Sequence, residues 1–186
     1  AALSFFSQRQ RDRVGLATFD HEIVEYVPPS TRHLQRILHT LTRAETGRPG
    51  LLRDPLMRLG DNLHNRGIIL VISDFYEEPE QVLESIRHLR ARGHDVIVFH
   101  LLDPAELDFP FESAASFRDM ESGRMIPIVP DELAAEYRTL IGEHTEELAR
   151  LFTGSRIDYT VLDTSKPLDH ALFKYLSSRE KMGRAR

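Results

Sequence analysis

Two short apolar runs on either side of an amphipathic segment constrain this chain more than any other feature. Residues 68–72 (IILVI) follow Gly67, and residues 96–99 (VIVF) follow Gly93. Short runs rich in β-branched residues and bounded by glycine are typical of strands buried on both faces. Between them, residues 78–92 carry apolar side chains at helical spacing, namely Val82, Ile86 and Leu89. The pattern predicts a strand–helix–strand unit whose two strands run parallel with a right-handed crossover.

The same alternation continues in both directions and predicts an α/β fold. Residues 14–19 and 23–27 indicate a hairpin whose second strand forms an antiparallel edge and stops at Pro28-Pro29. The next predicted elements are a helix capped by Ser30, a helix from Asp54 and an inserted β-hairpin of residues 117–121 and 124–129. A long helix from Pro130 with an unbroken apolar stripe, a strand at 157–162 and a helix at 167–178 are predicted to follow. We therefore expect a mostly parallel sheet in one domain of residues 1–178, followed by a basic tail of residues 179–186.

Composition restricts the class of protein and its partners. The 186 residues include 24 Lys and Arg against 29 Asp and Glu, for a net charge of −5. That balance argues against binding driven by overall charge, so we expect no nucleic-acid partner. The longest apolar runs are far shorter than the roughly 20 residues that span a bilayer, so we expect no membrane partner. The chain has no cysteine, which fits a reducing compartment and predicts a cytoplasmic protein.

Three predicted strands are followed by aspartate, at Asp74, Asp103 and Asp163. Ligands of open parallel sheets bind beyond the carboxyl ends of the strands, so these carboxylates are candidates for holding a hard cation such as Mg²⁺. The alternative for each is a structural role, in which the aspartate caps the next helix or shapes a turn. Asp103 precedes a proline and Asp163 precedes Thr164-Ser165, and both contexts suit capping. Asp74 is therefore the best candidate for a functional carboxylate and for a metal ligand.

Other residue types indicate little further chemistry. The nine histidines include no pair at the spacing of zinc ligands, and His100 and His144 lie on apolar segments where we expect hydrogen-bonded core residues. The chain has no Walker loop, no Gly-x-Gly-x-x-Gly fingerprint and no Gly-x-Ser-x-Gly elbow. One enzymatic alternative stays open, a Mg²⁺-dependent phosphotransferase or phosphohydrolase that uses Asp74 with Asp103 or Asp20.

Several strings of the sequence, taken in order, resemble a known family. They are residues 13–19 (RVGLATF), 71–75 (VISDF), 98–107 (VFHLLDPAEL), 117–123 (FRDMESG) and 161–168 (VLDTSKPL). Together they resemble the bacterial domain of unknown function fifty-eight, whose members carry a von Willebrand factor A-like domain. The resemblance implies a three-layer, Rossmann-like sheet of that type, often with a metal-ion-dependent adhesion site at its carboxyl edge. It also implies a partner, an AAA+ ATPase of the MoxR type, and it implies no enzymatic activity.

The resemblance further implies which residue would hold the metal. The parent site uses an Asp-x-Ser-x-Ser loop after the first strand, a Thr from a later loop and an Asp after the fourth strand. The last of these corresponds to Asp74, whereas no Asp-x-Ser-x-Ser precedes Val14 and the Thr position holds Pro49, Gly50 or Leu51. The site is thus incomplete in this chain, and a Mg²⁺ cofactor is implied for the complete protein. We expect a fragment without the first strand, a rearranged sheet that closes the gap, or self-association through the sheet edges left unpaired.

These observations combine into one expectation of function. We expect a non-catalytic protein-interaction module that works with the ATPase. Its binding surface is expected at the strand-end face, where Asp74, the loop of residues 47–50 and residues 103–111 converge.

Overall fold

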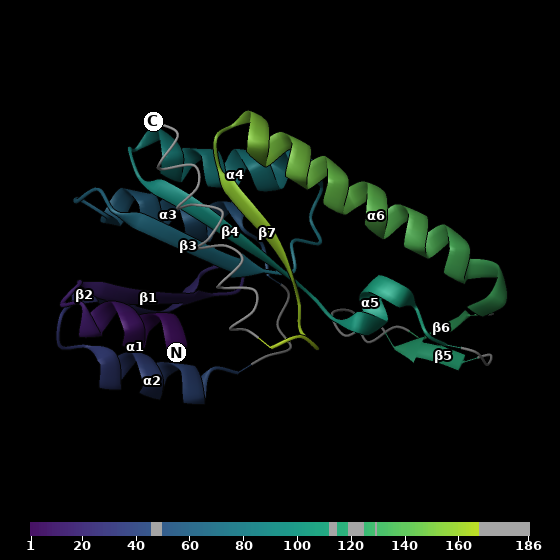
Figure 1. The fold of residues 1–186 in the computed structure, drawn as a ribbon, viewed down its shortest axis with the longest axis horizontal. Helices are drawn as coiled ribbons and strands as arrows, with labels where there is room; N and C mark the ends of the chain where they lie inside the picture. The colour runs from purple at the N-terminus through teal and green to yellow at the C-terminus, as the bar shows by residue number, and fades with distance from the viewer. Residues whose placement is uncertain (46–49, 112–114, 119–124, 129, 168–186) are drawn as a thin grey trace. The chain divides into compact units, whose positions relative to one another are not determined.

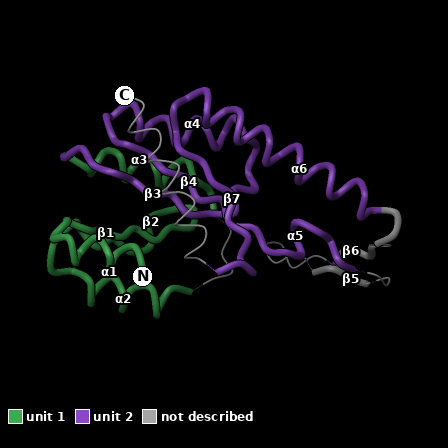
Figure 2. The backbone as a smooth tube through the Cα atoms, in the orientation of Figure 1, with its two compact units in different colours: residues 1–64, 120–123 green, residues 65–119, 124–186 purple. Residues whose placement is uncertain are grey.

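The computed structural model describes residues 1–45, 50–111, 115–118, 125–128 and 130–167 (Figure 1). The chain divides into two compact units (Figure 2). Unit 1 consists of residues 1–64, and unit 2 contains the described residues from 65 onwards. Apart from Pro167, the predicted C-terminal helix of residues 167–178 lies outside the described residues, and so does the predicted tail of residues 179–186.

Unit 1 combines a β-hairpin with helices. Its elements are α1 (Ala2–Arg9), β1 (Val14–Phe19), β2 (Ile23–Ser30), α2 (Leu34–Arg43) and α3 (Arg53–Asn62). β1 and β2 pair antiparallel, which confirms the predicted hairpin. In the turn, the Asp20 carboxylate accepts a hydrogen bond of 2.9 Å from the backbone N–H of Glu22. The buried apolar side chains of this unit are Val27, Ile37, Leu52 and Leu56.

Two predicted details of unit 1 are wrong. β2 does not stop at Pro28-Pro29 but continues to Ser30. Among the described strands it pairs with β1 alone, and an edge strand tolerates proline because one side of its backbone needs no hydrogen bond. Ser30 does not cap α2, whose N-cap position is His33; the Ser30 hydroxyl instead accepts a hydrogen bond from the backbone N–H of Arg32.

Unit 2 contains the predicted parallel sheet. Its elements are β3 (Ile68–Ser73), α4 (Pro79–Ala91), β4 (Asp95–Leu102), α5 (Pro104–Asp108), β5 (Ala115–Arg118), β6 (Met125–Ile128), α6 (Pro130–Gly154) and β7 (Asp158–Asp163). The strands β3, β4 and β7 are all parallel and lie in the order β3-β4-β7. β5 and β6 form an antiparallel hairpin between β4 and α6, which confirms the predicted insertion.

Helices α4 and α6 pack against each other and cover one face of this sheet (Figure 1). The predicted apolar stripe of α4 is confirmed, because Val82, Ile86 and Leu89 are completely buried. Leu148 and Phe152 near the end of α6 are equally buried. The central strand β4 is buried on both faces from Val96 to His100. Full burial of side chains of this size contributes about 1.5–3 kcal/mol each, so this interface contributes strongly to the stability of unit 2.

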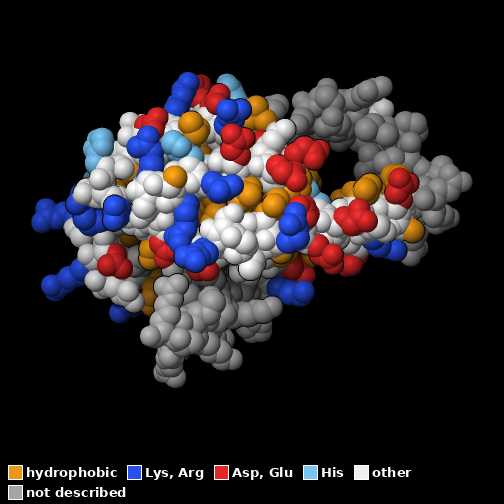
Figure 3. All heavy atoms as spheres, turned by 90° about the horizontal axis from the view of Figure 1, so that it is seen from above, with side chains coloured by type: hydrophobic (Ala, Val, Ile, Leu, Met, Phe, Trp, Pro, Cys, Tyr) orange, Lys and Arg blue, Asp and Glu red, His pale blue; other side chains and the backbone are white. Residues whose placement is uncertain are grey.

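Two predictions of burial in unit 2 are wrong. β3 is not buried on both faces, because Ile68 is 66% exposed and Ile72 is 48% exposed. Ile68 and Ile72 lie on the same face of β3, because successive side chains alternate between faces, whereas Val71 on the opposite face is buried. The apolar stripe of α6 is also not continuous, since Leu140 is 57% exposed. Figure 3 shows acidic side chains, in red, along the outer surface of this helix.

The architecture is a mixed α/β fold with a parallel three-stranded sheet and antiparallel pairs. It differs from the expected single sheet in one respect. The antiparallel strand β2 pairs with β1 in a two-stranded sheet of its own and is not an edge strand of the parallel sheet. In the parts of the chain that the structure describes, no helix is long and apolar enough to span a membrane.

Candidate functional site

The segment that follows β3 forms a tightly fixed loop. Phe75 adopts a left-handed backbone conformation with φ of 48°, which is rare for a large residue, and its side chain is buried. Its carbonyl oxygen accepts a hydrogen bond of 2.8 Å from Nε2 of His144 on α6. The Ser73 hydroxyl lies 3.2 Å from the Asp74 carboxylate, to which it donates a hydrogen bond. Phe75 thus anchors the loop in the core, while Asp74 and Tyr76 on either side of it are exposed.

Beneath this loop lies a buried polar cluster. Nδ1 of His100, on β4, is 2.6 Å from the hydroxyl of Tyr159, on β7. The His100 ring packs edge-on against Phe75 at 5.4 Å and against His144 at 6.2 Å between ring centroids. Burial lowers the pKa of His100 to about 4, because the interior disfavours the imidazolium. A hydrogen bond with the backbone of Asp74 and, to a lesser degree, the charge of Asp74 partly oppose the shift. Burial also raises the pKa of Tyr159. Both groups are therefore neutral near pH 7.

The helix α5, which follows β4, forms another part of the site. The Asp103 carboxylate accepts a hydrogen bond from the backbone N–H of Ala105, and Glu106 accepts one from the backbone N–H of Asp103, which together form a capping box. Glu106 also accepts a hydrogen bond from the hydroxyl of Tyr76, which ties α5 to the loop after β3. Partial burial and the neighbouring Glu106 carboxylate raise the pKa of Tyr76.

The segment after β7 lies at the same edge of the sheet. Its Thr164 hydroxyl is 3.3 Å from the Asp103 carboxylate, and its backbone N–H donates to the carbonyl oxygen of Leu102. The Asp163 carboxylate accepts hydrogen bonds from the backbone N–H and the hydroxyl of Ser165 and pairs with Lys166 at 2.9 Å. The Ser165 hydrogen bonds and the Lys166 ammonium lower the pKa of Asp163 to about 2.

The three aspartates predicted from the sequence therefore follow parallel strands at one edge of the sheet. Asp103 and Asp163 also have the structural roles that were their predicted alternative, since one caps α5 and the other shapes a turn. Asp74 differs because its carboxylate accepts a hydrogen bond from the hydroxyl of its sequence neighbour Ser73. His100 is a buried, hydrogen-bonded residue as predicted, whereas His144 is hydrogen-bonded but only half-buried. Of the predicted loop of residues 47–50, residues 47–49 lie outside the described residues.

The described residues do not fit a metal site. Across the described ranges, no three His, Asp or Glu side chains lie close enough together to hold a metal ion. Asp74 and the Ser73 hydroxyl supply too few oxygens, because Mg²⁺ and Ca²⁺ take six or more ligands. The role of Asp74 as a metal ligand stays a prediction, and it requires oxygen ligands beyond those that the described residues supply.

Sequence reasoning missed two contacts that shape the site. One is the hydrogen bond between Tyr76 and Glu106, and the other is the hydrogen bond from His144 to the Phe75 carbonyl. A sequence signal for the first contact is the aromatic pair Phe75-Tyr76, which directly follows an apolar strand. The second has no local signal, since its partners are 69 positions apart in the sequence.

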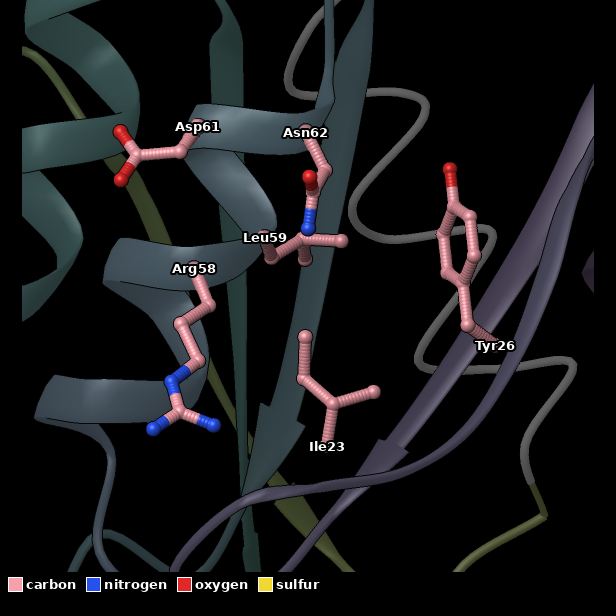
Figure 4. Close-up of a pocket in the computed structure, with 6 residues that line it drawn as sticks. All are labelled: Ile23, Tyr26, Arg58, Leu59, Asp61 and Asn62. Atoms are coloured by element: carbon pink, nitrogen blue, oxygen red, sulfur yellow. The ribbon is translucent and has the colours of Figure 1, made fainter.

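A separate pocket lies in unit 1 between β2 and α3. It has a volume of about 480 Å³ and is lined by Ile23, Tyr26, Arg58, Leu59, Asp61 and Asn62 (Figure 4). Figure 4 shows that the charged ends of Arg58 and Asp61 point in different directions. Ligand pockets usually combine apolar walls with polar groups that converge on one point, so this pocket is a poor candidate for a binding site.

The family described as "Protein of unknown function DUF58" matches residues 1–147. The chain belongs to this family. Uncharacterized proteins of Mycobacterium tuberculosis and Mycobacterium bovis are each 26% identical to it over 188 residues, which cover 97% of this chain and 58% of those proteins. The chain thus spans less than two thirds of the length of these relatives.

One solved structure is similar to this member of the DUF58 family. It is the crystal structure of the conserved hypothetical protein BatB from Bacteroides thetaiotaomicron, with a TM-score of 0.54 and 15% sequence identity. The alignment covers 97% of this chain and 87% of that one. At this level of identity the similarity concerns the fold alone.

Proposed function

We propose that this DUF58 chain is a non-catalytic protein-interaction module of the von Willebrand factor A type. Its binding surface is the carboxyl edge of the sheet formed by β3, β4 and β7. The observation that carries the proposal is the anchored loop of residues 73–76, in which a buried Phe75 in a strained conformation holds Asp74 and Tyr76 exposed.

The neighbouring loop repeats this design. Phe109, which ends α5, also has a positive φ of 44° and is also buried. Two loops are thus each held by a buried aromatic residue, while the residues on either side of that aromatic residue are exposed. A rigid scaffold that presents variable exposed side chains on loops is well suited to specific recognition. Tyr76, with 57% of its surface exposed, is the largest side chain presented by the loop after β3.

The proposed partner is an AAA+ ATPase of the MoxR type, and the proposed location is the cytoplasm. Both rest on the family resemblance. The test is a titration of the full chain with the purified MoxR-type ATPase of the same organism, followed by calorimetry. We expect Tyr76→Ala and Asp74→Asn to weaken binding at least about tenfold, as residues at the centre of an interface do.

The matched control is Tyr26→Ala, which removes another exposed tyrosine from β2 in unit 1. We expect this variant to bind the ATPase as the unmodified chain does. If the unmodified chain fails to bind, the proposed partner is wrong. If it binds but the Tyr76 and Asp74 variants bind equally well, the proposed surface is wrong.

A further inference from the structure

Exposed arginine side chains gather at one end of unit 1, where α1 ends, β1 begins and β2 ends (Figure 1). Val14 at the start of β1 pairs with Ser30 at the end of β2, so the residues just before β1 and just after β2 are neighbours. We call this surface the arginine patch, and its members are Arg9, Arg11, Arg13 and Arg32.

Hydrogen bonds hold the segments of the arginine patch together. The side chain of Gln8, near the end of α1, donates to the carbonyl oxygen of Thr31, which follows β2. The Arg13 guanidinium donates one hydrogen bond of 3.3 Å to the carbonyl oxygen of Pro29. A guanidinium carries five N–H donors, so most of the Arg13 donors are not used by this contact. The patch is therefore positioned by the fold and still has donors to offer.

Arg11 lies in a backbone conformation that arginine rarely adopts. Its φ is 66°, in the left-handed region. Its backbone N–H donates to the carbonyl oxygen of Gln8, and the N–H of Asp12 donates to that of Ser7. These two bonds end α1 in a Schellman motif, whose left-handed position is usually glycine. An arginine there costs stability that a glycine would not. The shape of the turn thus gives no reason for this side chain, whereas a ligand for its charge would.

The arginine patch has little compensating negative charge. Asp12 is the one acidic residue among residues 9–13. Within the described ranges, no carboxylate forms an ion pair with any of the four guanidinium groups. The helix dipole favours Arg9 at the carboxyl end of α1, but it disfavours Arg32, which lies two positions before the start of α2. Repulsion among four like charges is relieved when an anion binds between them.

We propose that the arginine patch binds an acidic segment of a partner protein. Guanidinium groups are planar and bind carboxylates through two parallel hydrogen bonds, so arginine is well suited to this ligand. A short peptide can contact the patch alone. A nucleic-acid duplex or an anionic membrane extends beyond it and is repelled by the rest of a chain whose net charge is −5. This surface is separate from the one proposed for the ATPase and does not depend on it.

A fluorescent peptide of six glutamates tests the proposal by anisotropy with the full chain. We expect a Kd on the order of 0.1 mM in 50 mM salt, and weaker binding by at least about fivefold in 300 mM salt, because the contacts are exposed ion pairs. Arg32→Glu replaces attraction by repulsion and should raise the Kd about tenfold. The matched control is Arg53→Glu, which changes the same charge at an exposed position of α3 in the same unit. No binding at about 1 mM chain, or an equal effect of both variants, would overturn the proposal.

Arg11→Gly separates binding from folding. The variant removes one positive charge, so we expect the Kd for the peptide to rise about threefold. It also relieves the strained conformation, so we expect the melting temperature to rise by about 3 °C. A purely structural arginine would give no such opposition between weaker binding and higher stability. Unchanged peptide binding by Arg11→Gly contradicts the proposal.

Two other anions distinguish the kind of partner. The same titration would use vesicles of phosphatidylglycerol and a short DNA duplex, each with the unmodified chain and with Arg32→Glu. We expect both to bind more weakly than the peptide at equal salt, because they meet the negative remainder of the chain. If either binds more tightly than the peptide and loses that affinity in Arg32→Glu, the arginine patch recognises a membrane or a nucleic acid and the proposed acidic segment is wrong.

Discussion

Acid is expected to destabilise unit 2 through His100. The ring is completely buried, and its Nδ1 is shared with the hydroxyl of Tyr159. Burial lowers the pKa of His100 from 6.5 to about 4 in the folded protein. In the unfolded chain the same group takes up its proton near pH 6.5. The unfolded state therefore binds more protons between these two values, and the stability that the neutral ring contributes is present above pH 6.5 and lost as the pH falls toward 4.

The size of the effect follows from the difference between the two pKa values. One pKa unit corresponds to about 1.4 kcal/mol, so the lowering from 6.5 to about 4 sets a ceiling of about 3 kcal/mol. Asp74 favours the charged ring and already opposes part of the burial effect. We expect a loss of about 2–3 kcal/mol from the free energy of unfolding between pH 7 and pH 4, a large fraction of the stability of a small domain.

Urea unfolding followed by far-UV circular dichroism, repeated from pH 7 to pH 4, measures this loss. The matched variant is His100→Asn, whose side-chain amide replaces Nδ1 beside Tyr159 and does not titrate in this range. The variant is expected to be less stable at pH 7, because it fills less of the interior. The difference in free energy between the two proteins should therefore shrink as the pH falls. A difference that stays constant from pH 7 to pH 4 would refute the reasoning.

Three further predictions concern single side chains. Asp103→Ala removes the N-cap of α5 and is expected to lower the free energy of unfolding by about 1 kcal/mol in urea titrations, whereas Asp103→Asn retains a capping oxygen and should lower it less. Ile86→Ala opens a cavity in the completely buried face of α4 and should cost about 2–5 kcal/mol, while Leu140→Ala on the exposed part of α6 should change stability by less than about 0.5 kcal/mol. With p-nitrophenyl phosphate and Mg²⁺, we expect no hydrolysis that Asp74→Ala abolishes, because Asp103, one candidate for the second carboxylate, already caps α5. Hydrolysis dependent on Asp74 would support the enzymatic alternative.

The sequence predicted the elements of unit 2 well, because their signals are local. The spacing of Val82, Ile86 and Leu89 predicts a helix with one buried face, and that face is buried. The placement of Asp74, Asp103 and Asp163 at one edge follows from parallel strands without further information. A local pattern can also predict the right secondary structure and the wrong burial. Residues 68–72 form the predicted strand, but Ile68 and Ile72 are exposed.

The remaining features depend on contacts between distant parts of the chain. The apolar run of β3 is compatible with a central strand or with an edge strand, and its neighbours decide which of the two it is. The hydrogen bond between His100 and Tyr159 joins residues 59 positions apart, and no spacing rule indicates it. No sequence pattern indicates the positive φ of Phe75 either. A phenylalanine keeps that conformation only because the surrounding contacts hold it there.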